Sequence, residues 1–386
     1  MNYPLASSSW DQLEIDSMQR VINSGHFSMG KEVSEFEKIF AEFIGSKYAV
    51  MVNSGSSANL LMVAALFYKS SGNLKPGDEV IVPAVSWSTT YYPLHQYGLR
   101  LKFVDIDLKT LNYDLKKLET SINHKTKAII AVNLLGNPNE FTKIKELVED
   151  SDILLLEDNC ESLGAKYKDK YAGTFGICGS FSTFFSHHIS TMEGGLVVTD
   201  DEEIHHILLS LRSHGWTRHL PKINKVTGTK SENHFDESFK FVLPGYNLRP
   251  LELSGAIGKV QISKLPDFID ARRTNAELFV SLFEEHPYLS IQQEVGLSSW
   301  FGFSFIVKEN SSITRQSILN RLDKIGVEYR PIVTGNFARQ PVIKYLNCDV
   351  SQELTNADYL DRNGFFIGNH HYDISEQLEL LRLELS

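Results

Sequence analysis

A glycine and two serines stand where a predicted strand passes into a predicted helix. Residues 53–59 read NSGSSAN and follow the apolar run 47–52. Gly55, Ser56 and Ser57 would therefore lie at a helix N-terminus, where free backbone N–H groups and the helix dipole attract a phosphate. The same pattern is also typical of a simple helix cap, which this motif taken alone favours.

Acidic side chains follow another predicted strand. Asp158 ends the run 153–158, which reads ILLLED, and Glu161 comes shortly after it. The carboxyl ends of parallel strands form the edge at which α/β enzymes bind their ligands. A carboxylate there could hold the protonated ring nitrogen of pyridoxal phosphate (PLP), or it could cap a helix. Trp87, just past a further strand, could stack on a flat cofactor ring or pack in the core.

Apolar runs of strand length alternate with helical patterns in the first part of the chain. These runs are 47–52, 79–83, 101–106, 129–133 and 153–158. Regular alternation of this kind predicts an α/β fold with a mostly parallel central sheet.

Two helices are predicted ahead of this sheet. Ser9 and Gln12 form a capping-box pattern, and the apolar spacing after them predicts a first helix that ends at Gly25. A second helix should cover residues 33–44, with its phenylalanines on one face.

The chain divides into three predicted parts. We expect a large domain over 1–255, a connecting helix over 256–287 and a smaller C-terminal α/β domain over 288–386. Pro266 interrupts the connecting helical stretch. Residues 216–240 are polar and rich in turn formers, which predicts a long loop.

The composition is that of an ordinary globular protein. The chain has 386 residues, of which 42% are hydrophobic and 22% are charged. Its formal charge of −10 argues against a nucleic-acid partner, because such proteins need a cationic face. No run is long enough to span a membrane and no secretory signal precedes the first helix, so we expect a cytoplasmic protein. Cys160, Cys178 and Cys348 have irregular spacing, which predicts neither disulfides nor a metal site.

The segment 180–204, SFSTFFSHHISTMEGGLVVTDDEEI, resembles the cofactor-lysine motif of the fold-type I PLP enzymes that aminate nucleotide-linked sugars. In that motif a serine precedes the lysine by five residues, and an acidic-Gly-Gly turn follows. Ser182 and the turn at 193–195 match, which places His187 at the position of the lysine. No lysine occurs in 171–221, so a small shift of the alignment cannot restore one.

The resemblance covers essentially the whole chain. Other matching strings, in the order of the family, are PAVSWSTTYYPL, LLEDNCESLGA, SHGWTR and LPGYNLRPLELSGAIG. The histidine and the string SHHISTMEGG resemble the branch of the family that removes a hydroxyl from GDP-linked 4-keto-6-deoxy sugars. The resemblance implies a PLP-dependent aminotransferase-like fold, with a large domain and a smaller one.

The resemblance also implies a site for PLP and for pyridoxamine phosphate (PMP), its amino form. The implied contacts are of the phosphate with Ser56, Ser57 and Ser182, of the ring face with Trp87, of the ring nitrogen with Asp158 and of the ring hydroxyl with Glu161. Asn247 would reach in from a second subunit, which implies a homodimer with active sites at the subunit interface.

Histidine in place of lysine changes the expected reaction. Histidine cannot form the stable covalent bond of lysine with PLP, so the cofactor would be held by noncovalent contacts alone. Its unperturbed pKa of about 6.5 suits a general base at neutral pH. The implied reaction takes the amine of L-glutamate, expels the C3 hydroxyl of the keto sugar with His187 as the base, and releases 2-oxoglutarate and ammonia.

Five further residues could join this site. His214 is a second candidate for catalysis, and Ser186 stands next to the proposed base. Arg218 could meet the diphosphate, and Glu328 and Arg330 could meet the nucleotide or the sugar. Structural roles and surface ion pairs are the alternatives for these residues.

Three other functions are alternatives to dehydration. An ordinary sugar aminotransferase would keep the same cofactor pocket but needs the missing lysine. A CDP-sugar dehydratase also uses histidine, but relatives with their own iron–sulfur cluster need cysteines that this chain lacks. A noncatalytic cofactor-binding protein could have lost its lysine by decay, yet the matching serine, aspartate, tryptophan and glycine positions are all retained.

Overall fold

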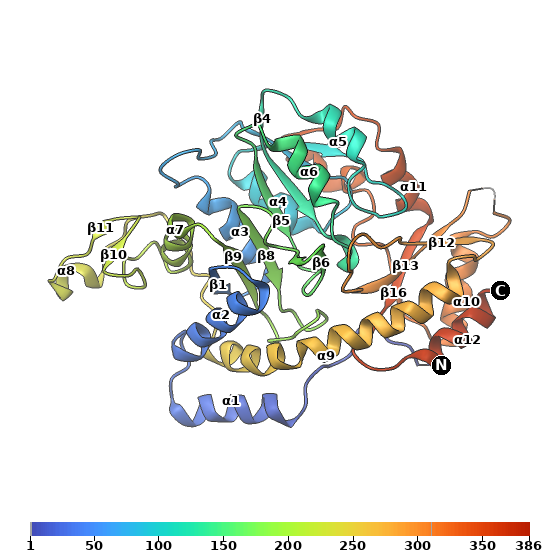
Figure 1. Cartoon of the computed structure of the whole chain (residues 1–386), viewed down its shortest axis with the longest axis horizontal. Coiled ribbons are helices and arrows are strands. Elements are labelled where there is room, and N and C mark those ends of the chain that lie inside the picture. Colours follow the sequence, from blue (N-terminus) through green and yellow to red (C-terminus); the bar gives the residue numbers. More distant parts are fainter. Residues whose placement is uncertain (1, 310) are drawn as a thin grey trace.

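The computed structural model describes residues 2–309 and 311–386, and its main feature is a large sheet with helices on both faces (Figure 1). The strands lie in the order β1 (Tyr48–Val52), β9 (Gly195–Thr199), β8 (Cys178–Ser182), β5 (Leu154–Asp158), β4 (Thr126–Val132), β2 (Glu79–Pro83), β3 (Arg100–Val104) and β15 (Cys348–Asp349). Only β9 is antiparallel to its neighbours among the described strands of this sheet. The predicted α/β fold with a mostly parallel central sheet is confirmed.

Alternating side chains of each strand pack against different helices. The helices of this part are α1 (Gln12–Ser24), α2 (Lys31–Ile44), α3 (Gly55–Ala65), α4 (Ser88–Gln96), α5 (Leu115–Ser121), α6 (Phe141–Val148), α7 (Glu202–Arg212) and α9 (Glu252–Phe283). Val50 and Val52 point to the core formed with α3, α4 and α7. Ala49 and Met51 point to the opposite core, formed with α2 and α9. Farther along that second face, α5 and α6 cover β2 and β4. The strands between β1 and β2 in this order are thus buried on both faces, as expected of a parallel sheet, whereas β3 and the edge strand β15 are partly exposed.

The C-terminal part forms a second, antiparallel sheet. Its strands lie in the order β12 (Leu289–Ile291), β13 (Gly302–Val307), β16 (Gly364–Gly368) and β14 (Tyr329–Arg330), and its helices are α10 (Arg315–Ile325), α11 (Thr355–Asn363) and α12 (Ser375–Leu385). Helices α10 and α12 pack on this sheet, whereas α11 packs into the core of the large sheet. Because β15 also pairs with β3, the C-terminal part contributes to both sheets. The division at residue 288 stays a prediction.

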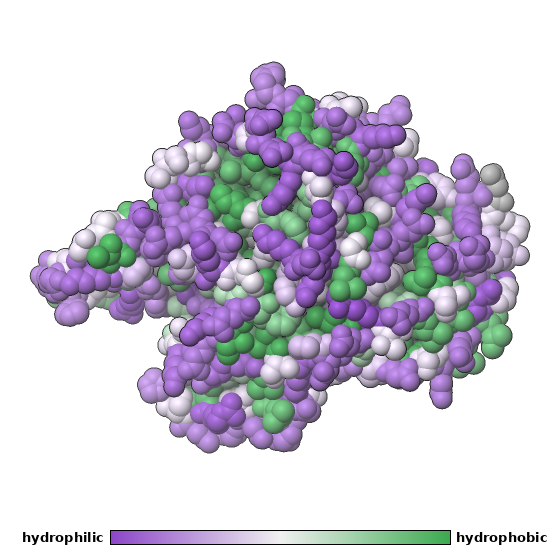
Figure 2. All heavy atoms as spheres, in the orientation of Figure 1, coloured by the Kyte–Doolittle hydropathy of each residue, from purple (hydrophilic) through white to green (hydrophobic). Residues whose placement is uncertain are grey.

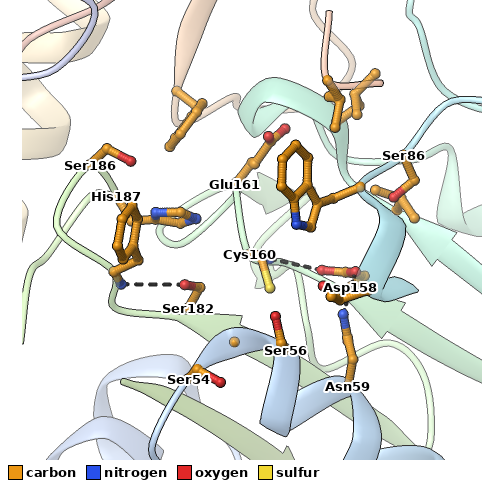
Figure 3. Close-up of a pocket in the computed structure, with 18 of the residues that line it drawn as sticks. Ser54, Ser56, Asn59, Ser86, Asp158, Cys160, Glu161, Ser182, Ser186 and His187 are labelled. Atoms are coloured by element: carbon orange, nitrogen blue, oxygen red, sulfur yellow. Dashed lines mark hydrogen bonds between the residues drawn. The ribbon is translucent and has the colours of Figure 1, made fainter. Parts of the chain in front are cut away.

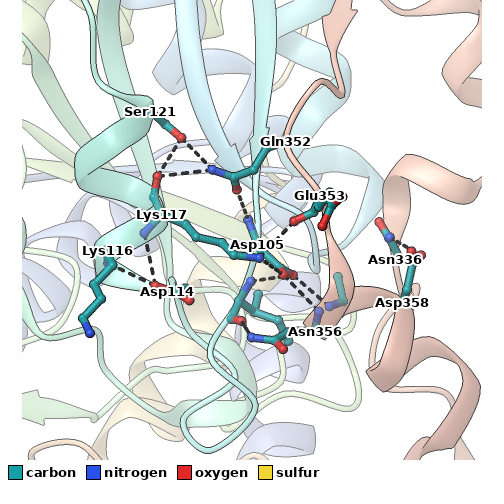
Figure 4. A network of polar contacts seen from close by, with 12 residues as sticks. Asp105, Asp114, Lys116, Lys117, Ser121, Asn336, Gln352, Glu353, Asn356 and Asp358 are labelled. Atoms are coloured by element: carbon teal, nitrogen blue, oxygen red, sulfur yellow. Dashed lines mark hydrogen bonds and ion pairs between the residues drawn. The ribbon is translucent and has the colours of Figure 1, made fainter.

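Asp105 links the two parts (Figure 4). This fully buried carboxylate accepts hydrogen bonds from the backbone N–H groups of Asn356 (2.9 Å) and Ala357 (2.8 Å), in the first turn of α11. Helix α11 has no side-chain cap of its own, so Asp105, the residue that follows β3, serves as its cap. The ammonium of Lys117 lies 2.7 Å from the same carboxylate and balances its charge.

The cap of the first helix differs from the prediction. Helix α1 does end at Gly25, but Asp11 and Glu14 form the capping box instead of Ser9 and Gln12. The Ser9 hydroxyl donates to the side chain of Gln261 on α9 (2.7 Å) and is not available to the helix. A tertiary contact therefore decided between two overlapping local patterns.

Pro266 does not divide the helix that follows the sheet. Helix α9 is continuous over Glu252–Phe283, and Figure 1 shows it running beneath both sheets. The interruption predicted from this proline is wrong. Proline removes one backbone hydrogen bond, but Ile262, Leu265 and Ile269 bury one face of the helix against the large sheet and hold it together.

Residues 213–249 form an arm that extends from the body near α7 (Figure 1). The stretch predicted as a loop contains short elements, a hairpin of β10 (Ile223–Asn224) with β11 (Gly228–Thr229) and the helix α8 (His234–Ser238). A second small hairpin joins β6 (Lys166–Tyr167) to β7 (Lys170–Tyr171), and short 3-10 turns are η1 (Leu134–Gly136), η2 (Phe337–Arg339) and η3 (Pro341–Tyr345). Among the helices of the described residues, none is long and apolar enough to cross a membrane. The cytoplasmic location stays a prediction.

Candidate active site

A cavity of about 730 Å³ opens at the carboxyl edge of the large sheet. Its walls come from the ends of β4, β5 and β8, the first turns of α3 and α4, the loop after β8, and the C-terminal part. The predicted site residues that line it are Gly55, Ser56, Trp87, Asp158, Glu161, Ser182, Ser186, His187 and Arg330. Side chains from distant parts of the sequence therefore meet at the edge where the sheet topology predicted a ligand site.

The start of α3 and the end of β8 approach each other closely at one end of this cavity. A Cβ atom at Gly55 would lie 2.6 Å from the Cβ atom of Ser182 and 3.1 Å from the sulfur of Cys160, so only glycine fits there. Figure 3 shows Ser56 and Ser182 on this side of the cavity. The Ser57 hydroxyl instead donates to Asn53 (2.6 Å), outside the lining. The backbone N–H groups at the start of α3 and the hydroxyls of Ser56 and Ser182 suit a phosphate.

Asp158 is held in a fixed orientation on the cavity wall. One carboxylate oxygen accepts hydrogen bonds from Asn59 (2.8 Å) and from Thr90 (2.7 Å), and the other accepts from the backbone N–H of Cys160 (3.1 Å). Only 5% of Asp158 is exposed. A buried, hydrogen-bonded carboxylate beside the cavity suits a protonated pyridine nitrogen, which would balance its charge.

Asn59 and Thr90 were not predicted as site residues. The sequence contains a signal for each of them in its helical spacing. Asn59 lies one helical turn after Gly55, and Thr90 lies nearly one turn after Trp87. Side chains at this spacing share a helix face, so each lies beside a residue that was predicted to touch the ligand.

Glu161 has an environment that favours its protonated form. Burial is the main cause that raises the pKa of Glu161 to about 7, and the nearby charge of Asp158 raises it further. A backbone hydrogen bond from Leu135 (3.0 Å) acts in the opposite direction. Near neutral pH this carboxyl group can therefore either donate or accept a hydrogen bond.

His187 faces the cavity from the loop after β8, across from Asp158 (Figure 3). Its ring packs against the ring of Phe301, with the centroids 5.3 Å apart. Burial lowers the pKa of His187 to about 4, and the cation of Arg272 contributes in the same direction. The imidazole is therefore neutral at pH 7 and can accept a proton.

Three predicted site residues lie on the arm and outside the cavity of this chain. His214 packs on Trp216, with the ring centroids 4.9 Å apart, and Arg218 stacks on the same indole at 4.8 Å. The Asn247 side chain accepts a hydrogen bond from Arg249 (2.9 Å). Within one chain the structure does not bring these residues to His187.

Glu328 and Arg330 lie at the rim on the C-terminal side. Glu328 accepts a hydrogen bond from the backbone N–H of Leu5 (2.9 Å), and Leu5 itself lines the cavity. Arg330 lines the cavity directly and donates to the carbonyl of Tyr329 (2.8 Å). Ser186 lies beside His187 (Figure 3). These positions leave the predicted substrate contacts of all three residues possible in one chain.

The cavity fits a phosphorylated pyridine cofactor that is not covalently attached. It offers a phosphate cradle that a Cβ at Gly55 would fill, a fixed carboxylate and a neutral imidazole. The residues that line it include no lysine. Among the described residues, no group of three or more His, Cys, Asp or Glu side chains could hold a metal ion.

The chain belongs to the DegT/DnrJ/EryC1/StrS aminotransferase family, whose model matches residues 9–377. It is 60% identical over 382 residues to GDP-4-keto-6-deoxy-D-mannose 3-dehydratase of Yersinia pseudotuberculosis. The matched region covers 99% of this chain and 97% of that relative. The solved structure of the E. coli enzyme with bound hydrated PLP is 60% identical, has a TM-score of 0.99 and matches 100% of both chains. A structure of GDP-4-keto-6-deoxymannose-3-dehydratase with a trapped PLP-glutamate geminal diamine gives the same identity, TM-score and coverage. The predicted family and its aminotransferase-like fold are confirmed.

A first prediction concerns the contact between α3 and β8. We expect Gly55→Ala to weaken PLP binding at least about tenfold, because the added methyl group pushes α3 away from Ser182. Fluorescence titration of the PLP-free protein with PLP measures this loss. Gly25→Ala is the control, because Gly25 ends α1 in open space and its substitution should lower the melting temperature without changing PLP affinity. Equal affinities of the two variants would contradict the assignment.

A second prediction concerns the protonation of His187. In the PLP-free protein its imidazole should titrate near pH 4, so that it is neutral at every higher pH and becomes charged only on acidification. NMR titration of the protein with isotope-labelled histidine measures the midpoint, and the His187→Asn variant identifies the signal. A midpoint at or above about 6.5 would show that the ring is not buried as described.

Proposed function

We propose that this chain is a PLP-dependent dehydratase that removes the C3 hydroxyl of GDP-4-keto-6-deoxymannose and produces GDP-4-keto-3,6-dideoxymannose. The observation that carries the proposal is the neutral imidazole of His187 in a cofactor cavity whose lining contains no lysine. The 60% identity to enzymes of this activity, over nearly the full length of both chains, supports the same substrate.

L-Glutamate supplies the electrons of the proposed reaction. Replacement of the C3 hydroxyl by hydrogen is a two-electron reduction of the sugar. Oxidation of glutamate to 2-oxoglutarate and ammonia provides these two electrons, and the water that it consumes equals the water that the sugar loses. The overall reaction is therefore balanced without a metal or a further redox partner.

The bound cofactor, in its PMP form, supplies an electron path next to C3 and C4 of the sugar. The protein residues act around that path. His187 is neutral, so its ring nitrogen can take up a proton, and the resulting imidazolium can then assist the departure of hydroxide from C3. Asp158 keeps the ring nitrogen of the cofactor protonated. Glu161 holds a proton at its carboxyl group and can donate it to the ring hydroxyl.

The same residues disfavour transamination, in which the sugar would keep the amine. A sugar aminotransferase returns a proton to the product carbon with a lysine amine, and the cavity lining contains none. A noncatalytic protein would have no need for a base with a lowered pKa beside an oriented carboxylate. Ser186 and Arg330, with Glu328 at the rim, stay proposed contacts of the sugar or the nucleotide.

We further propose that the active protein is a homodimer in which the arm of one chain completes the site of the other. The arm carries His214, Arg218 and Asn247 away from the cavity of its own chain. It also exposes apolar side chains, which Figure 2 shows among polar surroundings at the far end of the arm. Phe235 and Phe239 are 86% and 70% exposed, which is unusual for a surface without a partner.

The proposed reaction predicts that the amine nitrogen of L-glutamate is released as ammonia. L-Glutamate should convert bound PLP to its amino form, which changes the absorption spectrum. Addition of GDP-4-keto-6-deoxymannose should then release ammonia and a deoxygenated sugar in equal amounts, while CDP- and dTDP-linked keto sugars should react more slowly. His187→Asn should slow dehydration by about 10²- to 10⁴-fold, as expected for loss of a general base. An amino sugar without free ammonia would establish transamination, and no spectral change would establish a noncatalytic protein.

The proposed dimer predicts complementation between two inactive variants. In a mixed dimer of His187→Asn and Asn247→Ala chains, one site carries both substitutions and the other carries neither. Equal mixing during refolding should therefore restore about one quarter of the activity, because half of the dimers are mixed and half of their sites are intact. The dehydration rate of the mixed sample is compared with the rate of each variant refolded alone. If the mixture is no more active than its components, Asn247 does not act across the interface.

A further inference from the structure

Residues 298–301, with the sequence SSWF, are held by an unusual set of contacts behind His187. Each of the four successive backbone carbonyl groups accepts a hydrogen bond from a different side chain. The pairs are Ser298 with Arg273 (3.0 Å), Ser299 with His188 (3.1 Å), Trp300 with Asn369 (2.9 Å) and Phe301 with Arg272 (3.2 Å). We call residues 298–301 the wall segment.

Two backbone N–H groups of the wall segment bind the turn η1. Ser299 donates to the carbonyl of Gly136 (3.0 Å), and Phe301 donates to that of Leu135 (3.0 Å). A Cβ atom at Gly136 would lie 2.6 Å from the nitrogen of Trp300, so glycine is required for this approach. Trp300 has a positive φ of 47°, which persists only where the surroundings determine it.

The wall segment contacts His187 directly and is linked to Glu161 through Leu135. The ring of Phe301 packs on His187, with the centroids 5.3 Å apart, and on His188, with the centroids 5.8 Å apart. Leu135, which accepts the N–H of Phe301, donates its own N–H to Glu161 (3.0 Å). The positions of His187 and Glu161 are therefore set against one rigid element.

His188 is the link between this element and the catalytic loop. Its ring is 2% exposed and does not line the cavity, so it cannot touch the substrate. A carbonyl oxygen can only accept, so Nε2 of His188 must carry the proton in the bond to Ser299. Because His188 follows His187 directly, this bond fixes the backbone from which the base projects.

We propose that His188 is a positioning residue, whose hydrogen bond to the Ser299 carbonyl holds the imidazole of His187 against Phe301 in the orientation required for proton transfer. The inference rests on the proposed role of His187 as the base. A displacement of a reacting group by about 1 Å can cost about 100-fold in rate, so a residue without substrate contact can still control catalysis.

The test compares substitutions that keep or remove the donor. His188→Leu removes it, His188→Asn is too short to reach Ser299, and His188→Gln places an amide N–H where Nε2 lies. We expect Leu and Asn to lower kcat about 10- to 100-fold, with the KM for the sugar and the Kd for PLP changed less than about threefold. We expect Gln to restore kcat to within about threefold of the unsubstituted protein.

His286→Leu is the matched control. His286 is equally buried and its Nε2 donates to the carbonyl of Leu385 at the same distance of 3.1 Å, but it lies in the C-terminal core away from the cavity. This variant should melt at a lower temperature and keep its kcat. A fall of kcat in His286→Leu equal to that in His188→Leu would mean that lost stability explains both, and the proposal would fail.

Hydrogen–deuterium exchange of the PLP-free protein gives a readout that does not depend on activity. The amides of Ser299 and Phe301 should exchange faster in His188→Leu and His188→Asn, and at the normal rate in His188→Gln and His286→Leu. Unchanged exchange, or no rescue by Gln, would overturn the proposal. The rate of PLP conversion by L-glutamate also depends on His187 as the base. If the unsubstituted protein converts PLP but leaves the sugar intact, the proposed dehydration fails while the positioning of His187 is still decided.

Discussion

The close approach of α3 to the end of β8 is the constraint on which the site depends. Gly55 permits it, because any side chain there would occupy the space of Ser182. Ser182 ends β8, and the next residues lead into the loop that carries His187, so one junction positions both the proposed phosphate cradle and the proposed base. A cofactor without a covalent bond to the protein must be positioned by such contacts alone, which makes their rigidity a requirement of catalysis.

Burial shifts the pKa values of His187 and Glu161, two groups of the cavity, in opposite directions and favours the uncharged form of each. It lowers the pKa of His187 to about 4 and raises the pKa of Glu161 to about 7. At neutral pH His187 is therefore uncharged and Glu161 is partly protonated. We propose that the ring of the cofactor meets the hydrogen-bonded carboxylate of Asp158. Because His187 is neutral and Glu161 can hold a proton, one group can accept a proton from a ligand while the other donates one, and the net charge of the site changes little.

The local sequence pattern was sufficient for prediction where a short segment determines its own structure. Asp158 ends an apolar run, and the carboxyl edge of a parallel sheet is a property of the topology, so this residue was predicted at the edge where the structure shows the cavity. Ser182 was predicted from the resemblance to the family motif and also lines the cavity. Prediction failed where a distant contact decides. Gln261 engages Ser9 and leaves Asp11 to cap α1, and the packing of Leu265 keeps α9 helical through Pro266.

The arm residues that we propose for the site of a second chain could not be placed from one chain by any local rule. Asn247 and His214 are adjacent to strong sequence signals, yet their own fold leaves them outside the cavity. The bond between His188 and Ser299 joins residues 111 positions apart, and no periodicity encodes it. Such long-range bonds make the second sheet a support for the catalytic loop. In our proposal the orientation of the base therefore depends on residues that the C-terminal part contributes.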